Sequence, residues 1–290
     1  MSLDAAFPDR VERRACAGFS LVEIIVVVGL LSFIMLGLLV MFNQTQRVFR
    51  SGMTQTDVLE GGRLVTDMMR RELLQMRPSH DFNAVNFFVQ RPRVKPLEQD
   101  LPGQPVIERT NLLQQLYFLT RENQTWTGFG YVVADPDSGG FATNLGTLYR
   151  FERSTNALQS ASGLFSAFDL ARHTPKQLSR VLDGVVHFKV RAYNTNGVWI
   201  TGNFKPGVNI VVQPDNYATG EIRYYNFYSD AVPAFVEFEI GVLEDRALQR
   251  ARSLPAGPVR AKYLKENLAG RVHLFRTRVP IQNVDTAAYR

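Results

Sequence analysis

One acidic side chain near the N-terminus stands in surroundings that do not suit a charge. Glu23 is the only charged residue between Phe19 and Phe42, and most of its neighbours in this stretch are large and aliphatic. In lipid such a carboxylate is costly unless a cation or hydrogen-bond donors lie beside it. The sequence therefore predicts a partner for Glu23. Gly18 marks the point where a short polar leader meets the apolar run.

A second pair of carboxylates, Asp135 and Asp137, lies in the glycine-rich segment 135–140. Oxygen ligands two residues apart in such a turn are suited to calcium. However, no glutamate follows to complete a calcium loop, and aspartate, proline, serine and glycine are the ordinary residues of a solvated turn. We interpret the segment as a turn and keep Asp135 and Asp137 only as a weak calcium candidate.

The remaining reactive side chains do not form a catalytic or metal-binding pattern. No histidine has another histidine three or four residues away, as the zinc motifs require; the histidines are His80, His173, His187 and His273. No Gly-x-Ser-x-Gly elbow, phosphate-binding loop or dinucleotide fingerprint occurs, and the single cysteine, Cys16, lies in the leader. The sequence therefore predicts no enzyme, no metal site and no cofactor.

The chain is modestly basic, with a formal net charge of +6. All of this charge belongs to the part after the leader, because the acidic residues of the leader are balanced by Arg10, Arg13 and Arg14. Basic and aromatic residues are neighbours at Arg223 and 224–228, a pattern that can stack nucleic-acid bases. Sheet cores use the same residues more often. Nucleic acid is therefore kept as an alternative partner and not as the prediction.

The uncharged run behind Glu23 is the element that must position it. As a helix, residues 19–42 would be about 36 Å long, enough to cross the hydrocarbon core of a bilayer. Because Arg13 and Arg14 precede the run, the positive-inside rule predicts a single-pass protein with a cytoplasmic N-terminus and an exported C-terminal part. A secretory signal peptide would place its small residues after the apolar core, whereas here the glycine precedes it.

These residues resemble the signal of type IV prepilins. The resemblance rests on the hexapeptide Gly-Phe-Ser-Leu-Val-Glu that begins at Gly18, next to the uncharged run. It implies that an inner-membrane prepilin peptidase cuts between Gly18 and Phe19 and methylates the new amine of Phe19. It also implies that Arg13 and Arg14 are basic leader residues and that Glu23 is the family's glutamate at mature position five. The alternative is a plain signal anchor.

Cleavage at this point would give Glu23 a partner, because the freed ammonium of Phe19 carries a positive charge. We therefore hypothesise that Glu23 sets the axial register as a subunit leaves the bilayer and joins a filament. Cleavage would also remove Cys16, so the mature chain would contain no disulfide. In this the chain departs from many major pilins, which carry a C-terminal disulfide loop.

The rest of the chain predicts an α+β fold in which one long N-terminal helix packs on an antiparallel sheet. We expect the helix to reach residue 77 and to bend or melt locally at Gly61-Gly62. The expected divisions are a leader (1–18), a transmembrane and filament-core helix (19–42), its amphipathic continuation (43–77), a proline-rich connection (78–110) and an exported β-rich domain (111–290). Strands are expected at 85–90, 112–121, 126–134, 147–153, 185–193, 197–201, 208–213, 221–228, 234–242 and 271–279, and short helices at 165–172, 176–182, 244–252 and 259–269.

The segments 182–191, 232–240 and 271–279 resemble PilW-type minor pilins and the J-type pseudopilins of type II secretion. K-type pseudopilins usually lack the glutamate that stands here at Glu23. The resemblance implies a structural subunit that is incorporated into a type IV pilus or a type II secretion pseudopilus and primes its tip.

The implied partners are the prepilin peptidase, other minor pilins or pseudopilins, and the inner-membrane assembly platform. The implied location is the inner membrane and then the filament. Two alternatives stay open: a DNA- or surface-binding module displayed on such a filament, and a signal-anchored exported enzyme.

Overall fold

The computed structural model describes residues 20–93, 95–101, 104–136, 139–156, 159–202, 208–216 and 220–289. The chain divides into two compact units, Met1–Gly52 and Met53–Arg290. A single helix, α1 (Leu21–Leu74), begins in the first unit and ends in the second.

Helix α1 differs from the prediction at its C-terminal end and at its glycine pair. It ends at Leu74 instead of residue 77, because Met76 forms an antiparallel bridge with Thr120. It is continuous through Gly61-Gly62, so the predicted local melting is wrong. A Cβ atom at Gly62 would lie only 2.2 Å from the ring of Phe275. The missing side chain therefore serves a close contact between the helix and a strand.

The second unit is built around a large antiparallel sheet, which confirms the predicted α+β class. Its strands are β1 (Val85–Gln90), β2 (Leu97–Leu101), β3 (Gln104–Asn111), β4 (Gln115–Glu122), β5 (Thr125–Ala134), β6 (Gly146–Ser154), β7 (Ser179–Tyr193), β8 (Ile210–Pro214), β9 (Ile222–Tyr228), β10 (Phe235–Leu243) and β11 (Val272–Pro280). The main sheet has 9 strands in the order β11-β10-β7-β6-β5-β4-β1-β9-β8, and β2 pairs only with β3.

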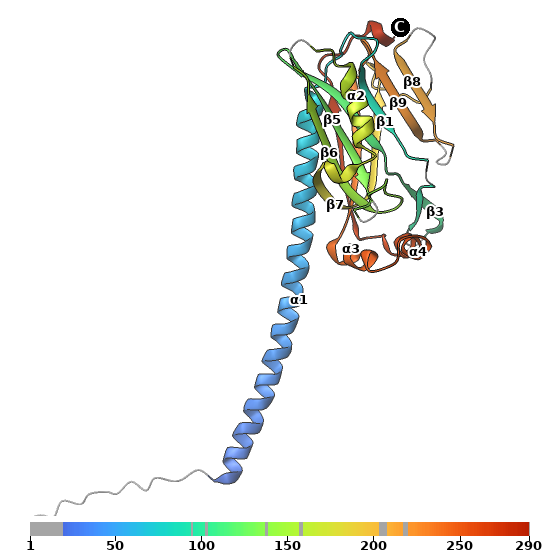
Figure 1. The fold of residues 1–290 in the computed structure, drawn as a ribbon. Helices are drawn as coiled ribbons and strands as arrows, with labels where there is room; N and C mark the ends of the chain where they lie inside the picture. Colours follow the sequence, from blue (N-terminus) through green and yellow to red (C-terminus); the bar gives the residue numbers. More distant parts are fainter. Residues whose placement is uncertain are drawn as a thin grey trace, which may run out of the picture. The chain divides into compact units, whose positions relative to one another are not determined.

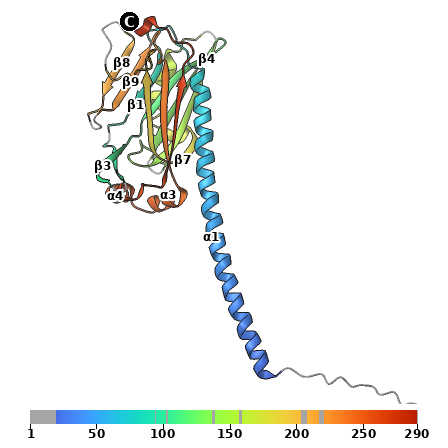
Figure 2. The ribbon, with the colours of Figure 1, turned by 180° about the vertical axis from the view of Figure 1, so that it is seen from behind.

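Different layers cover the two faces of this sheet. Successive residues of a strand point to opposite faces, so Phe87 and Phe118 pack in the cluster that contains α1, while Phe88 and Tyr117 pack in the cluster that contains α2 (Ser162–Ala171). Figure 1 shows α2 in front of the sheet, and in the reverse view of Figure 2 the sheet hides it. The part of α1 after residue 64 contributes the apolar stripe of the first cluster: Val65, Met69 and Leu73, continued by Met76.

A third apolar cluster closes one end of the sheet. It contains α3 (Asp245–Arg252) and α4 (Pro258–Asn267), with Leu248 and Leu264 packed in the same cluster as Leu97 of β2. The β2–β3 hairpin thus lies beside these helices, as Figure 1 shows at the lower end of the sheet.

Strand β7 changes its neighbour halfway along its length. Its first part pairs with β6, but farther on the N–H of Phe188 donates to the carbonyl oxygen of Leu112 (2.6 Å). The buried side chain of Gln114 then joins β7 to β9: its Oε1 accepts from the N–H of Val190 (2.6 Å), and its Nε2 donates to the carbonyl oxygen of Ile222 (2.9 Å). The sheet therefore curls around one shared core.

Three segments of the second unit have a secondary structure that differs from the prediction. Residues 197–201 form no strand, because the turn at Asn194 is followed only by a bridge between Tyr193 and Trp199. The helix expected at 176–182 is a short 3₁₀ turn followed by β7, whose pairing with β6 overrides the local pattern. The segment 78–110 contains β2 and β3 in addition to the expected β1.

Candidate functional site

Glu23 is the one predicted processing or assembly residue that the structure describes. Gly18, Phe19, Arg13 and Arg14 lie outside the described residues, so their roles stay predictions. Ser20, the first residue that the structure describes, immediately precedes α1.

Ser20 and Glu23 cap the start of α1 by hydrogen-bonding each other. The N–H and the hydroxyl of Ser20 donate to Glu23 Oε2 at 3.3 and 3.4 Å. The N–H of Glu23 donates to Ser20 Oγ at 3.3 Å. This reciprocal pattern is a capping box, and it satisfies backbone donors that the first turn of a helix otherwise leaves unpaired.

The capping box gives Glu23 partners that the sequence analysis missed. The signal was present as Ser-x-x-Glu directly before an apolar run. In addition, Glu23 lies in the first turn of α1, where the positive end of the helix dipole stabilises an anion. The carboxylate is therefore partly stabilised within its own chain, before any contact with Phe19 or a second subunit.

The helix behind this cap has a surface suited to lipid or to other helices. Residues Leu21–Phe49 form the one described helix that is long and apolar enough to cross a membrane, and their side chains are exposed. The hydroxyls inside the run are satisfied locally: Ser32 donates to the carbonyl oxygen of Val28 (2.8 Å) and Thr45 to that of Met41 (2.9 Å). Neither hydroxyl therefore needs water as a hydrogen-bond partner.

In the second unit, a partly buried polar contact fixes the end of α1 to the sheet. Glu72 accepts a hydrogen bond from the hydroxyl of Tyr131 on β5 (2.5 Å) and from Nε of Arg150 on β6 (2.8 Å). Burial, reinforced by the charge of Glu72, raises the pKa of Tyr131. The contact adds charge-assisted hydrogen bonds to the apolar stripe, and because these bonds are directional they fix how α1 is rotated about its own axis relative to the sheet.

The weak calcium candidate gains no support. Asp135 directly follows β5, where its N–H donates to the carbonyl oxygen of Gly140 (2.9 Å) and its own carbonyl accepts from the N–H of Gly139 (2.9 Å). These bonds are those of a turn. Asp137 lies outside the described residues, and among the residues that are described no three histidine, cysteine or carboxylate side chains are grouped so as to hold a metal ion.

The buried histidine of the sheet has a structural environment. The N–H of Leu112 donates to Nδ1 of His187 (3.1 Å), so the neutral ring carries its proton on Nε2, which lies 3.5 Å from Glu239. Burial lowers the pKa of His187, and the interaction with His187 lowers that of Glu239 to about 2. His187 therefore links the segment before β4 to β7 and β10.

The aromatic residues considered for base stacking serve the core. Tyr225 and Phe227 on β9 are fully buried in the cluster beneath α1, and Tyr224 packs edge-on against Phe88 on the other face. Trp199 donates to the hydroxyl of Tyr225 (2.8 Å). These rings are therefore not displayed as a platform for nucleic-acid bases.

Comparison with known proteins locates the recognisable part of the chain at this N-terminal site. Residues 13–39 match the family model described as the prokaryotic N-terminal methylation motif. The match spans the predicted junction and the first part of α1, and with the apolar helix it is consistent with a type IV pilin-like prepilin signal. The motif is that of pilin-type structural proteins and not of an enzyme family. Neither the curated proteins nor the solved structures that were compared gave a match.

Proposed function

We propose that the chain is a minor pilin or pseudopilin that enters the inner membrane with its N-terminus in the cytoplasm. Prepilin peptidase cuts it between Gly18 and Phe19 and methylates Phe19. Helix α1 then packs among the helices of other pilin-like subunits, and the second unit is displayed outside the membrane. The observation that carries this proposal is the match of residues 13–39 to the methylation-motif model. It coincides with the start of a capped helix whose apolar side chains are exposed from Leu21 to Phe49.

The apolar surface of α1 supports a role in assembly. Its apolar side chains are exposed throughout the part of the first unit that the structure describes, so they require lipid before assembly and neighbouring helices after it. Moving an apolar helix from lipid to a helix bundle changes its hydrophobic energy little, so close packing and polar pairing must drive the transfer. Glu23 is the polar group placed to direct it.

The size of the second unit supports a minor subunit, of the PilW type or the J type. A domain with a 9-stranded sheet and two covering layers is difficult to repeat densely along a thin filament. A few copies at the tip, assembled with other minor subunits, meet no such constraint. We therefore place the chain in a priming complex.

Processing is tested by mass analysis of the intact protein, purified after expression with a prepilin peptidase. The mature chain should begin at Phe19 and carry one extra methyl group. Gly18→Val should block the cut, whereas Cys16→Ser, a leader substitution two residues away, should leave it unchanged. A product that begins at Met1, or at any residue other than Phe19, would overturn the proposal.

Assembly is tested with two substitutions that separate charge from capping. Glu23→Gln removes the charge but keeps a carbonyl oxygen that can accept from Ser20. Ser20→Ala keeps the charge but removes the hydroxyl, at a cost of about 1 kcal/mol to the helix start. After cleavage, we expect Glu23→Gln to abolish co-isolation with partner subunits from sheared filaments and Ser20→Ala to retain most of it. Wild-type recovery of Glu23→Gln would show that the charge does not direct assembly.

A further inference from the structure

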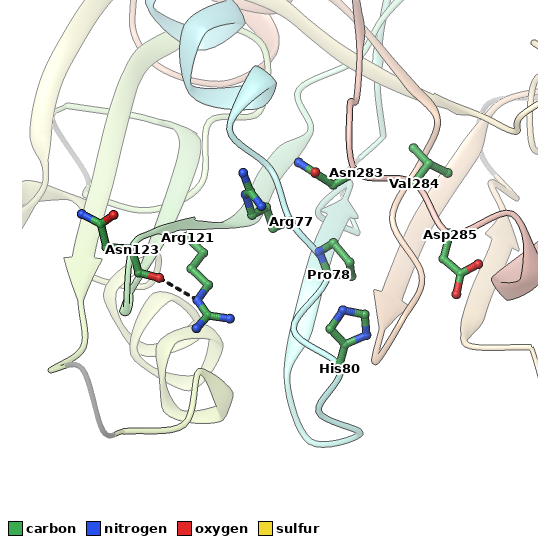
Figure 3. A pocket seen from close by; sticks show the side chains of 8 residues that line it. All are labelled: Arg77, Pro78, His80, Arg121, Asn123, Asn283, Val284 and Asp285. Atoms are coloured by element: carbon green, nitrogen blue, oxygen red, sulfur yellow. Dashed lines mark hydrogen bonds between the residues drawn. The ribbon is translucent and has the colours of Figure 1, made fainter.

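A polar cavity lies in the second unit, near the point where α1 ends. Its volume is about 570 Å³, and it is lined by side chains from three segments far apart in the sequence: 77–80 after α1, 121–123 at the turn between β4 and β5, and 283–285 after β11. Figure 3 shows Arg77 and Arg121 on one side of the space and Asp285 on the other. Helix α3 lies at the opposite end of the sheet (Figure 1).

The side chains of Arg77 and Arg121 are exposed, and the structure positions Arg77 through its backbone and Arg121 through its side chain. The N–H of Arg77 donates to the carbonyl oxygen of Leu119 (3.2 Å), which fixes its backbone beside β4. Nε of Arg121 donates to the backbone carbonyl oxygen of Asn123 (3.0 Å), and its guanidinium lies 5.1 Å from the ring centre of Trp126. Little further ordering of Arg121 would be needed to bind a ligand, and such preorganisation favours binding.

The guanidinium groups of Arg77 and Arg121 have no carboxylate partner in the described part of the chain, unlike several other arginines of the sheet. Arg150, Arg191 and Arg276 all form ion pairs. For Arg77 and Arg121 the structure records none among the described residues. The acid on the rim, Asp285, already accepts a hydrogen bond from the N–H of Ala287 (2.8 Å). The cavity therefore presents guanidinium donors that are not committed to an acid.

From this geometry we infer that the cavity binds a ligand through a carboxylate held between Arg77 and Arg121. Guanidinium groups bind planar carboxylates with paired hydrogen bonds. Two features favour a singly charged carboxylate over phosphate. The negative end of the α1 dipole lies just before Arg77, and Asp285 adds a negative charge across the space.

The cavity volume leaves room for more than the carboxylate itself. Pro78 and Val284 give part of the wall an apolar surface, and the ring of His80 is held by Asp230 at 2.6 Å. The lining therefore fits an acidic side chain together with the backbone that carries it. The assignment does not depend on the processing of the N-terminus.

The experiment uses the full chain in a mild detergent and isothermal titration calorimetry. The probes are N-acetyl-aspartate amide, its asparagine counterpart, acetate and inorganic phosphate. We expect N-acetyl-aspartate amide to bind, and the asparagine counterpart to bind at least about tenfold more weakly because it lacks the charge. Weaker binding of acetate would show that the apolar wall contributes and that a peptide-borne carboxylate is preferred. Acetate that binds equally well would overturn the inferred role of that wall.

Two cavity variants and one matched control identify the site. Arg77→Gln and Arg121→Gln should each weaken binding of N-acetyl-aspartate amide at least about tenfold. Arg246→Gln, on the exposed side of α3, removes the same charge at the other end of the sheet and should leave binding unchanged. Melting temperatures would confirm that each variant is folded. In a Trp199→Phe background, the emission of Trp126 should change on binding, since its ring lies beside Arg121.

Several results would overturn the inference. These are no binding by the wild-type chain, tighter binding of phosphate than of N-acetyl-aspartate amide, or equal weakening by Arg246→Gln and Arg77→Gln. The last result would mean that the probe responds only to the net positive charge of the protein.

Discussion

The two neighbouring glycines of α1 should respond oppositely to alanine. A Cβ atom at Gly61 would lie 3.5 Å from Cδ1 of Leu182, which is an ordinary contact, so Gly61→Ala should stabilise the fold by about 0.5–1 kcal/mol through helix propensity. A Cβ atom at Gly62 would lie 2.2 Å from Cε2 of Phe275, with two more ring atoms within 2.8 Å.

The contact at Gly62 determines the size of the opposite effect. Carbon atoms that pack well are separated by about 3.5–4.0 Å, so the ring of Phe275 would have to move by more than about 1 Å. Such overpacking typically costs about 1–3 kcal/mol, which exceeds the helix-propensity gain of about 1 kcal/mol. Gly62→Ala should therefore destabilise the fold by up to about 2 kcal/mol. The two alanine variants should differ by about 1–3 kcal/mol.

Chemical denaturation of the unit Met53–Arg290, followed by the fluorescence of Trp126 and Trp199, measures this difference. The control is Phe275→Ala, which removes the ring. In that background Gly62→Ala should become stabilising, as Gly61→Ala is. If Gly62→Ala is equally harmful without the ring, or is stabilising with it, the close contact is not the reason for the glycine.

Three further predictions concern charged and ionisable side chains of the same unit. Glu72→Gln should lower the free energy of unfolding by about 1–3 kcal/mol in the same denaturation assay, because Arg150 would lose its partly buried, charged partner; an unchanged midpoint would refute this. The pKa of Glu239 is lowered from 4.5 to about 2, so its stabilising effect is present above pH 4.5 and is lost as the pH falls towards 2. Glu239→Gln should flatten the dependence of melting temperature on pH in that range, and an equally steep dependence would contradict the assignment. Burial raises the pKa of Tyr131 above its ordinary value of 10.0, so stability should fall as the pH rises past 10; Tyr131→Phe should weaken this fall, and an equally steep fall in the variant would contradict the role of the buried hydroxyl.

Much of the fold could be predicted because single segments carry strong local signals. The apolar run behind Glu23 and the stripe that includes Met69 and Leu73 predict α1, and alternation predicts strands such as β10 and β11. The strands that were missed, β2 and β3, are rich in polar residues. They form because they pair with each other and because β2 contacts α4. Pairing between distant segments has no signal in a single stretch of sequence.

The candidate sites also differ in whether a local sequence pattern could predict them. The Ser20–Glu23 box could have been predicted, since both residues lie within four positions of each other in a known capping pattern. The cavity at Arg77 could not, because it combines the end of α1, the β4–β5 turn and the segment after β11. Only the fold brings Arg77 and Arg121 to one place. In the sequence each is a single basic residue with no special neighbours.

The capping box changes what the predicted ammonium of Phe19 has to contribute. Both bonds from Ser20 go to Oε2 of Glu23, and among the described residues no hydrogen bond is recorded to Oε1. Capping and the helix dipole already make the carboxylate tolerable at the start of a membrane helix. Oε1 therefore remains available to bind a cation or donor, either on its own chain or on a neighbouring subunit. On this reasoning Glu23→Gln should enter the membrane and be cleaved as efficiently as wild type. It should fail only when subunits join, because it loses the charge that binds a partner cation and keeps an apolar helix that is stable in lipid.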